Sequence, residues 1–493
     1  MNNTGASRTL ESKMQRLDTL ITNATVITAA DRFVADIGIR DGRIVALGEG
    51  LAEGAGPVGE TIDASGLWVM PGGIDAHCHL AQPLGDGAVM ADDFASGTRS
   101  AAAGGTTTVI PFAAQFKGQS LRTAVEDYHR ESDGKAMIDY AFHMIVTDPN
   151  QTVLREELPA LIEEGYSSFK IYLTYDDLKL NDREVLEVLA LARREGAMVM
   201  VHAENADCIA YLTELLEAQG HTAPRYHAEA HSSIAEREAT HRAISLAELI
   251  DVPLLIVHVS GPQAIEQIRW AQSRGLRVYG ETCPQYLMLT ADDLDQAGFE
   301  GAKCVCSPPP RDPAAQQAVW EALESGVFQV FSSDHAPFRY EDDKGKKLHG
   351  EEASFSCIPN GIPGLETRLA ILFSEGVVKQ RIDATRFVAL TATNPAKIYG
   401  LYPRKGTIAV GSDADLTLWD PEARVTVRND DLHHAVDYTP YEGLELTGRV
   451  VMALCRGQVV ARDGKPCGQA GDGQFLRCDK PTPARPRGQA KGF

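Results

Sequence analysis

Residues 167–202 read SSFKIYLTYDDLKLNDREVLEVLALARREGAMVMVH. The stretch holds two short apolar runs, at residues 168–173 and 197–202, and between them a segment whose apolar residues recur at intervals of three and four. This spacing predicts an amphipathic helix between two buried strands, a unit in which the two strands run parallel.

The same alternation continues on both sides of this unit. Six more apolar runs of strand length lie at residues 74–79, 106–112, 140–146, 253–259, 276–282 and 327–333. Eight strands alternating with helices are typical of an α/β protein with a (β/α)8 TIM-type barrel, which we place at residues 71–402. An open doubly wound sheet is the alternative, but no glycine-rich dinucleotide fingerprint follows the first run.

Both ends of the chain differ from the middle in the secondary structure that their sequence pattern predicts. Short β-prone runs separated by turns occupy residues 18–70 and return at residues 403–465. Neither half is large enough to close a hydrophobic core by itself, so we expect one small β-sandwich domain built from both ends. Residues 1–17 are expected to form a flexible leader. Residues 466–493, rich in Pro, Gly and basic residues toward their end, are expected to be a disordered tail or an arm on a neighbouring subunit.

Composition limits the class of partner. The 493 residues carry a formal net charge of -21, which repels phosphate backbones and anionic lipids, so we expect no nucleic-acid or membrane partner and a small-molecule substrate. The N-terminal residues lack the apolar core of a secretory signal, and no apolar run reaches the length of a membrane span. Nine scattered cysteines are typical of a reducing compartment, so the cytoplasm is the expected location.

Unusual polar residues fall at the ends of five predicted strands. They are His77 and His79 in the first run, Lys170 in the fourth, His202 in the fifth, His258 in the sixth and Asp334 after the eighth. Active sites of (β/α)8 barrels lie at the C-terminal ends of the strands, so we expect these side chains to converge on one mouth. Imidazole and carboxylate groups are ligands for Zn, Fe, Ni or Mn, and the set therefore predicts a metal centre.

Each of these residues also has an ordinary alternative role. A lone buried histidine is more often a core residue with a satisfied hydrogen bond, and Asp334 could cap a following helix. His77 and His79, two residues apart on one strand, face the same side. Agreement across five strand ends favours the metal site over coincidence. Asp334 could then bind a metal ion and also accept a proton from bound water, a catalytic role.

Lys170 is the only lysine in this set, and it lies between Phe169 and Ile171 in a run expected to be buried. Burial lowers the pKa of an amine, and a neutral amine can capture carbon dioxide as a carbamate. The carbamate is a carboxylate-like anion whose two oxygens can bridge two cations. A lysine that extends out of the strand or pairs with an acid is the alternative. The four histidines expected in the same mouth favour the carbamate.

Several longer motifs point to one family. They include PGGIDAHCHL, AAAGGTTTVI, SSFKIYLTY, VMVHAEN, IVHVS, GETCPQYLMLT, CSPPPR, SSDHAPF and IPNGIPGLETR. From about residue 18 to about residue 465, the sequence resembles the dihydropyrimidinase and D-hydantoinase family of the amidohydrolase superfamily. The resemblance implies two divalent metal ions, with zinc expected. One ion would be held by His77, His79 and Asp334, and the other by His202 and His258, with N6-carboxylated Lys170 and a hydroxide bridging them.

The resemblance also implies a reaction. It is the hydrolytic ring opening of a cyclic amide, a 5,6-dihydropyrimidine or a hydantoin, to an N-carbamoyl amino acid, as in pyrimidine degradation. Tyr175 would polarise the substrate carbonyl, and Ser307 and Asn360 would bind the ring amide through backbone groups. The expected substrate is a small cyclic amide or ureide, and the expected assembly is a homo-oligomer, a tetramer or a dimer.

Alternatives remain within and outside this reaction class. Dihydroorotase, allantoinase and cyclic imidase belong to the same superfamily and open other rings. Many dihydroorotases have an arginine two residues after the second histidine to bind the substrate carboxylate; Ala81 stands there, which disfavours an anionic ring. The loops around residues 80–92 and 172–178 would set the preferred ring. A non-catalytic dihydropyrimidinase-related scaffold is the alternative of another class, but all six candidate ligands are present.

Overall fold

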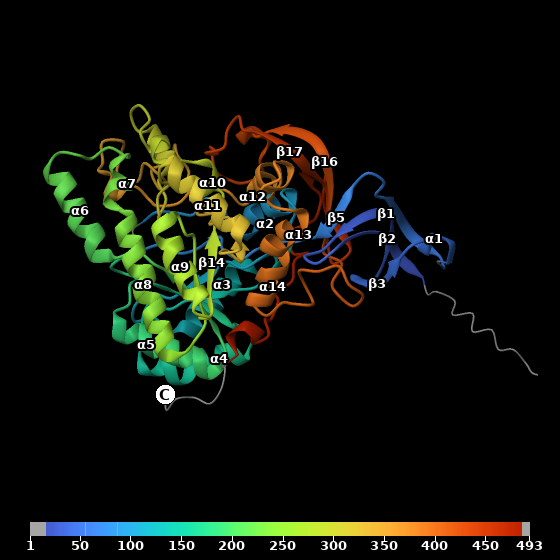
Figure 1. The fold of residues 1–493 in the computed structure, drawn as a ribbon, viewed down its shortest axis with the longest axis horizontal. Helices are drawn as coiled ribbons and strands as arrows, with labels where there is room; N and C mark the ends of the chain where they lie inside the picture. Colours follow the sequence, from blue (N-terminus) through green and yellow to red (C-terminus); the bar gives the residue numbers. More distant parts are fainter. Residues whose placement is uncertain (1–15, 55, 86, 486–493) are drawn as a thin grey trace, which may run out of the picture.

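The computed structural model describes residues 16–54, 56–85 and 87–485, and its described part consists of a helix-wrapped barrel and a sheet formed by both ends of the chain (Figure 1). The expected α/β class with a barrel and a composite β domain is confirmed. Most of the expected leader, residues 1–15, and the end of the expected tail, residues 486–493, lie outside the described residues.

The barrel strands are short, and every one of the eight apolar runs overlaps at least one of them. They are β6 (Gly73–Asp75), β7 (Thr106–Val109), β8 (Phe112–Ala114), β9 (Asp139–Tyr140), β10 (His143–Ile145), β11 (Ser168–Tyr172), β12 (Met198–His202), β13 (Leu254–Ile256), β14 (Val278–Thr282) and β15 (Val330–Phe331). A seven-stranded parallel sheet has the order β8-β10-β11-β12-β13-β14-β15, and β6, β7 and β9 form a second parallel sheet.

The second and third runs each divide into two strands. In the second run the break falls at Pro111, which has no N–H to donate to a neighbouring strand. The first halves, β7 and β9, lie in the sheet with β6, while the second halves, β8 and β10, continue toward β11. The last run returns to the first through a parallel bridge between Cys78 and His335 and a hydrogen bond from Ser333 N to Asp75 Oδ1. These contacts close the barrel.

The unit at residues 167–202 has the predicted structure. Its helix, α5 (Asp182–Glu195), lies between β11 and β12, which pair in parallel so that Tyr172 faces His202. Asn181 caps the helix by accepting from Glu184 N, and the Glu184 side chain accepts in return from Asn181 N. Gly196 ends the helix at φ +75°, a left-handed conformation that glycine adopts without steric cost.

Helices cover the outside of the barrel, with α8 packed between α5 and α9 (Figure 1). The α-helices besides α5 are α1 (Leu51–Gly54), α2 (Phe94–Ala103), α3 (Leu121–Ser132), α4 (Leu158–Glu163), α6 (Ala206–Ala218), α7 (Tyr226–Ala230), α8 (Ser233–Ile250), α9 (Pro262–Ser273), α10 (Gln285–Met288), α11 (Pro313–Ser325), α12 (Arg368–Leu372), α13 (Ala384–Val388) and α14 (Asn394–Ile398). Turns of π-helix at Val153–Glu157, Phe373–Val378 and Ala389–Thr393 extend α4, α12 and α13. Short 3-10 turns lie at Ala291–Leu294, Glu300–Cys304, Phe355–Cys357, Asn429–Asp431 and Thr482–Ala484.

The two ends of the chain share one nine-stranded sheet. Its strands are β1 (Leu17–Ile27), β2 (Arg32–Arg40), β3 (Arg43–Gly48), β4 (Val58–Asp63), β5 (Trp68–Pro71), β16 (Leu416–Thr426), β17 (Glu445–Cys455), β18 (Gln458–Arg462) and β19 (Lys465–Pro466). The halves join where β5 pairs with β16. Where the sheet domain meets the barrel, the buried Lys405 ammonium donates to Asp139 Oδ2 at 2.7 Å and to Asp415 Oδ2 at 2.8 Å.

The segment after β19 corrects one expectation. Residues 467–485 lie against the barrel of their own chain, where Leu476 N donates to Tyr140 O at 2.7 Å. Leu476 and Ala484 are fully buried and pack with Ile398 and Tyr399 of the barrel. Residues 467–485 are therefore neither a disordered tail nor an arm on a neighbouring subunit. The Pro, Gly and basic residues that suggested a tail are concentrated at residues 480–493.

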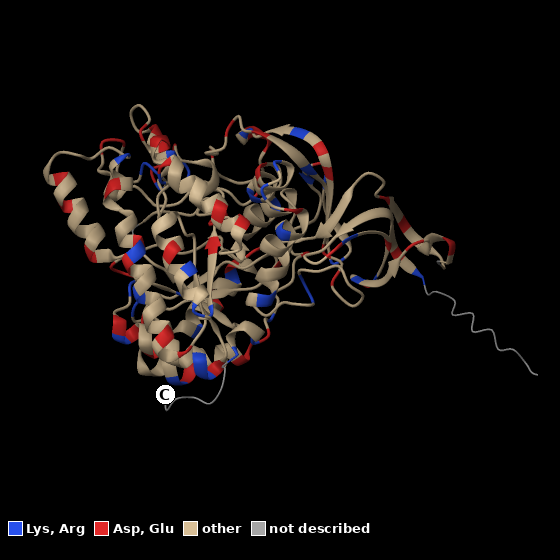
Figure 2. Cartoon of the chain, in the orientation of Figure 1, with Lys and Arg blue, Asp and Glu red and all other residues tan. Residues whose placement is uncertain are grey.

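The surface charge is mixed. Figure 2 shows acidic and basic residues interspersed along the outer helices and on the sheet domain. Among the described residues, no helix combines the length and the apolar character needed to cross a membrane.

Candidate metal centre

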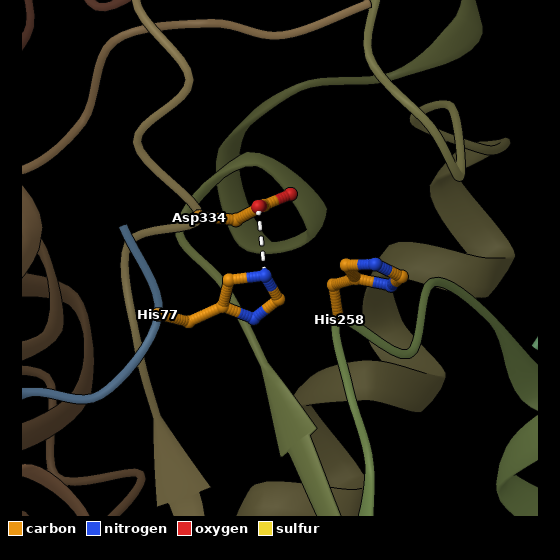
Figure 3. A group of neighbouring side chains, drawn as sticks. All are labelled: His77, His258 and Asp334. Atoms are coloured by element: carbon orange, nitrogen blue, oxygen red, sulfur yellow. Dashed lines mark ion pairs between the residues drawn. The ribbon is translucent and has the colours of Figure 1, made fainter. Parts of the chain in front are cut away.

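The six candidate ligands lie together at the C-terminal mouth of the barrel. All are buried, and they come from five different strand ends, as the sequence predicted. Figure 3 shows His77, His258 and Asp334 with their side chains directed toward one another. One ligand atom of each lies within 4.8 Å of the others.

Two groups of close contacts make up the cluster. Around His77, the Nε2 atom lies 2.9 Å from Lys170 Nζ and 3.2 Å from Asp334 Oδ1, which is also 3.4 Å from Nε2 of His79. In the second group, Nδ1 of His202 lies 3.0 Å from Nε2 of His258. The inner nitrogens of four histidines, one amine and one carboxylate therefore face a common centre.

The outer nitrogens of three histidines have acceptor partners. Nδ1 of His77 pairs with Glu281 Oε1 at 2.6 Å, and Nδ1 of His79 pairs with Gln82 Oε1 at 2.6 Å. Nε2 of His202 pairs with Glu204 Oε2 at 2.7 Å. When a hydrogen-bond acceptor lies next to one ring nitrogen of a neutral histidine, that nitrogen carries the proton. The other ring nitrogen then has a free lone pair.

Burial lowers the pKa of His77, His202 and His258, and the nearby Lys170 adds to the effect, so these three rings are neutral. Nδ1 of His258 is buried and has no hydrogen-bond partner among the described residues. Neutral imidazoles with inward lone pairs, next to an ionised carboxylate, form a donor set that suits a divalent transition-metal ion. The residues present therefore fit the expected metal ions.

Asp334 is the charged partner in the cluster. Burial by itself would raise the pKa of Asp334, but the adjacent His77 and His79 lower it to about 2. Asp334 and His258 both have left-handed backbones, with φ values of +49° and +38°. Such conformations cost about 1–3 kcal/mol each in non-glycine residues and concentrate at functional sites.

Lys170 is 1% exposed, and burial lowers the pKa of its amine. Its Nζ atom lies 4.8 Å from the centroids of the Phe112 and Tyr172 rings, so two aromatic rings pack beside the amine. This is the environment in which an amine spends more time neutral and nucleophilic.

Tyr175, Ser307 and Asn360 meet at one side of the cluster. Asn360 Nδ2 donates to the Tyr175 hydroxyl at 3.4 Å, and the Tyr175 ring lies 5.4 Å from the His202 ring. Burial raises the pKa of Tyr175, while hydrogen bonds with Ser307 and Asn360 oppose that effect. The hydroxyl therefore remains a hydrogen-bond donor at neutral pH.

The residues that orient the candidate ligands were not identified from the sequence. Glu281 lies at a buried position of β14, and Glu204 receives hydrogen bonds from both His202 and His231 Nδ1, the latter at 3.0 Å. Burial by itself would raise the pKa of Glu204, but these two histidines lower it. A charged residue inside a predicted strand was a usable signal for Glu281. His231 follows α7, far from any strand end, so no sequence pattern indicated it.

Comparisons with known proteins agree with this arrangement. The sequence profile of the Amidohydrolase family matches residues 68–460, and that of the urease alpha-subunit N-terminal domain matches residues 2–57. A D-hydantoinase from Geobacillus stearothermophilus is 48% identical over 460 residues, covering 93% of this chain and 96% of that protein. A D-phenylhydantoinase from Escherichia coli O7:K1 is 41% identical over 460 residues, covering 93% of this chain and 97% of the relative.

Solved structures give the same result. The crystal structure of a dihydropyrimidinase from Brevibacillus agri superposes with a TM-score of 0.90 at 44% identity, covering 94% of this chain and 99% of the other. An L-hydantoinase (dihydropyrimidinase) from Arthrobacter aurescens gives a TM-score of 0.84 at 30% identity, covering 94% and 100%. With its barrel and its cluster of histidines at the strand ends, the chain belongs to the amidohydrolase family.

Proposed function

We propose that the chain hydrolyses the ring of a hydantoin or a 5,6-dihydropyrimidine to give an N-carbamoyl amino acid. The observation that carries the proposal is the convergence of four histidines, Lys170 and Asp334 at one barrel mouth. Similarity to proteins named D-hydantoinase, across more than nine-tenths of the chain, supports the class of substrate.

The proposal assigns a metal site to these side chains. His77, His79 and Asp334 would hold one divalent ion, and His202 and His258 a second, with N6-carboxylated Lys170 shared between them. When bound, two such ions, zinc in this proposal, lower the pKa of a water molecule and polarise a carbonyl group. The lowered pKa of Lys170 supports its modification, because the neutral amine adds to carbon dioxide and releases a proton.

Asp334 moves the proton in this proposal. With a pKa of about 2 it is ionised at neutral pH, so it can accept a proton from the attacking water. The same carboxyl group then returns the proton to the ring nitrogen as the C–N bond breaks. Its position beside both His77 and His79 keeps it at the reacting centre.

Tyr175 stabilises the developing charge. Its hydroxyl, protonated because burial raises its pKa, donates a hydrogen bond to the carbonyl oxygen as negative charge develops there. Backbone groups of Ser307 and Asn360 hold the ring amide beside it. The contacts among these three side chains support a shared binding face.

Two further features of the enzyme belong to the same proposal. Helix α6 is rich in apolar residues, yet none of its residues is buried, and Tyr211 is 67% exposed. Apolar surface of this kind is typical of a subunit interface, which supports a homo-oligomer, a dimer or tetramer. All nine cysteines are free thiols, which supports a cytoplasmic location.

Turnover tests the proposal directly. The purified protein, loaded with zinc and bicarbonate, should open dihydrouracil or 5-substituted hydantoins faster than allantoin, dihydroorotate or succinimide. Both enantiomers of each hydantoin are needed, because relatives named D- and L-hydantoinase share the fold. Protein that binds less than one metal ion per chain and opens none of these rings would instead be a non-catalytic scaffold.

A further inference from the structure

Lys346 is a buried lysine outside the metal centre. Its side chain is 1% exposed, and Nζ donates to the carbonyl oxygens of Val305 at 2.8 Å and Pro359 at 2.7 Å. Burial lowers the pKa of Lys346 to about 7. An ammonium group without a carboxylate partner is costly to bury, so the two carbonyls are its compensation.

Both carbonyls belong to the loops that carry the proposed substrate contacts. Val305 lies two residues before Ser307, and Pro359 immediately precedes Asn360. The loops also contact each other directly, because Gly361 N donates to Val305 O at 3.1 Å. Val305 O therefore accepts from both Gly361 and Lys346, and the lysine joins the loops at this point.

A third loop of the mouth is attached to the segment that carries Lys346. Val89 N donates to Lys344 O at 2.9 Å, so residues 344–346 contact the loop at residues 80–92 as well. Lys346 thus lies where three substrate-proximal loops meet, while the ligand residues of the metal centre make no hydrogen bond with it among the described residues.

We propose that Lys346 is a positioning residue: its side-chain amine, by donating to both loops, helps to set the distance between the Ser307 and Asn360 loops and thereby the geometry of ring binding. The inference rests on the proposed function for the role of the two loops. A shift of about 1 Å in a binding group can change catalytic efficiency by about a hundredfold. Besides the direct bond from Gly361 N to Val305 O, the two hydrogen bonds from Nζ link the loops, and no carboxylate among the described residues pairs with Nζ at this point.

The test compares Lys346→Met with Lys347→Met. The adjacent Lys347 pairs with Glu341 and Glu351, and among the described residues it makes no hydrogen bond or ion pair with either substrate loop, so it is a matched control. In Lys346→Met, KM for the ring should rise by about tenfold to a hundredfold, while kcat changes much less and metal content is unchanged. Lys347→Met should keep the wild-type KM.

Amide hydrogen exchange gives a readout that does not depend on turnover. In metal-loaded Lys346→Met, exchange at residues 305–307 and 360–361 should be faster by about tenfold or more, and in Lys347→Met it should not change. Lys346→Gln, which keeps one donor group, should fall between Lys346→Met and the wild type in both measurements.

Three results would overturn the proposal. They are unchanged KM and unchanged exchange in Lys346→Met, a loss of metal or of kcat with KM unchanged, and failure of every Lys346 variant to fold, which would assign the ammonium to stability alone. Wild-type protein that opens no ring would contradict the proposed function. The exchange measurement would still decide whether Lys346 holds the two loops.

Discussion

Glu281 Oε1 lies 2.6 Å from Nδ1 of His77, and neither side chain is exposed to solvent. The two residues come from β14 and β6, which belong to different sheets of the barrel. Glu281 also accepts from Ser332 Oγ at 2.9 Å and from His258 N at 3.2 Å. One carboxyl group therefore orients residues of both halves of the proposed metal site.

Removing this carboxyl group should weaken metal binding. Glu281→Ala leaves Nδ1 of His77 without its acceptor, and loss of such an orienting partner costs about 10- to 100-fold in metal affinity or activity. Glu281→Gln keeps an acceptor oxygen and should lose less. Metal content after graded chelation, measured beside kcat/KM, checks both variants. Full metal retention by Glu281→Ala would show that His77 needs no such partner.

Lys170→Ala should lose metal and activity together, because it removes the group proposed to be shared by the two ions. A short carboxylic acid such as acetate or propionate can enter the space left and supply two oxygens, so it should restore part of both. Lys170→Arg is the control: it keeps a positive charge, cannot form the carbamate, and should not respond to the acid. Metal analysis and turnover with and without acid are the measurements. A fully active Lys170→Ala protein would refute the carbamate.

Tyr175→Phe should reduce kcat by about 10²–10³-fold, the usual effect of removing one donor to a developing oxyanion. Metal content should stay at the wild-type level, because the hydroxyl contacts Asn360 and is not among the proposed ligands. Tyr402→Phe, at an exposed position after α14, is the control and should be fully active. If Tyr175→Phe lost its metal, the tyrosine would belong to the metal site instead.

Lys405→Met should destabilise the junction between the barrel and the sheet domain by about 3–5 kcal/mol, since it removes the cation shared by the buried carboxylates of Asp139 and Asp415 and leaves, among the described residues, only Arg456 paired with Asp139. Burial would lower the pKa of Lys405, but these carboxylates outweigh it and raise the pKa. The stabilisation should therefore persist up to the unfolded-state pKa of about 10.4. Urea unfolding midpoints, with the exposed Lys397→Met as control, measure the effect. Equal midpoints for Lys405→Met and wild type would contradict it.

The stability difference between wild type and Lys346→Met should depend on pH. The pKa of Lys346 is about 7 in the folded chain and about 10.4 in an unfolded one. Between these values the unfolded chain binds more protons at this residue, so stability of the wild type relative to the variant should rise with pH. The neighbouring thiols of Cys304 and Cys306 stay protonated, because burial raises their pKa.

Unfolding midpoints between about pH 5.5 and 9.5 check this dependence. The difference should be flat below about pH 6 and should rise above about pH 7, where folded Lys346 is neutral and unfolded lysine is not. Lys347→Met should give a flat difference over the same range, because the pKa of Lys347 is raised by Glu341 and Glu351. A flat difference for Lys346→Met as well would mean that the buried amine keeps its ordinary pKa.

The strand ends were predictable because they obey a local rule. Each apolar run is short and ends near a polar residue, and barrel geometry then brings those ends to one mouth. His77, Lys170 and His258 could be placed together without knowing any pair distance. The break in the second run was also marked, by Pro111, although its consequence for the sheet order was not apparent.

The partners of those residues depend on tertiary contacts that no local pattern encodes. Glu281 reaches His77 across the barrel interior, and His231 reaches Glu204 from the end of a five-residue helix. Composition alone was also a poor guide at the C-terminus. Leu476 and Ala484, within the expected tail, are fully buried against the barrel.

The pairing of β5 with β16 has a consequence for biosynthesis. Strand β5, which includes Trp68, emerges from the ribosome before the barrel. Its partner strand β16, in which Trp419 pairs with Trp68, emerges only after the barrel. At about 5–20 residues per second, the edge of β5 that pairs with β16 stays unpaired for tens of seconds. An exposed strand edge can pair with other chains during that interval. The yield of soluble protein should therefore depend on how quickly β16 is synthesised and pairs with β5. It should also depend on chaperones that cover the unpaired edge of β5 until then.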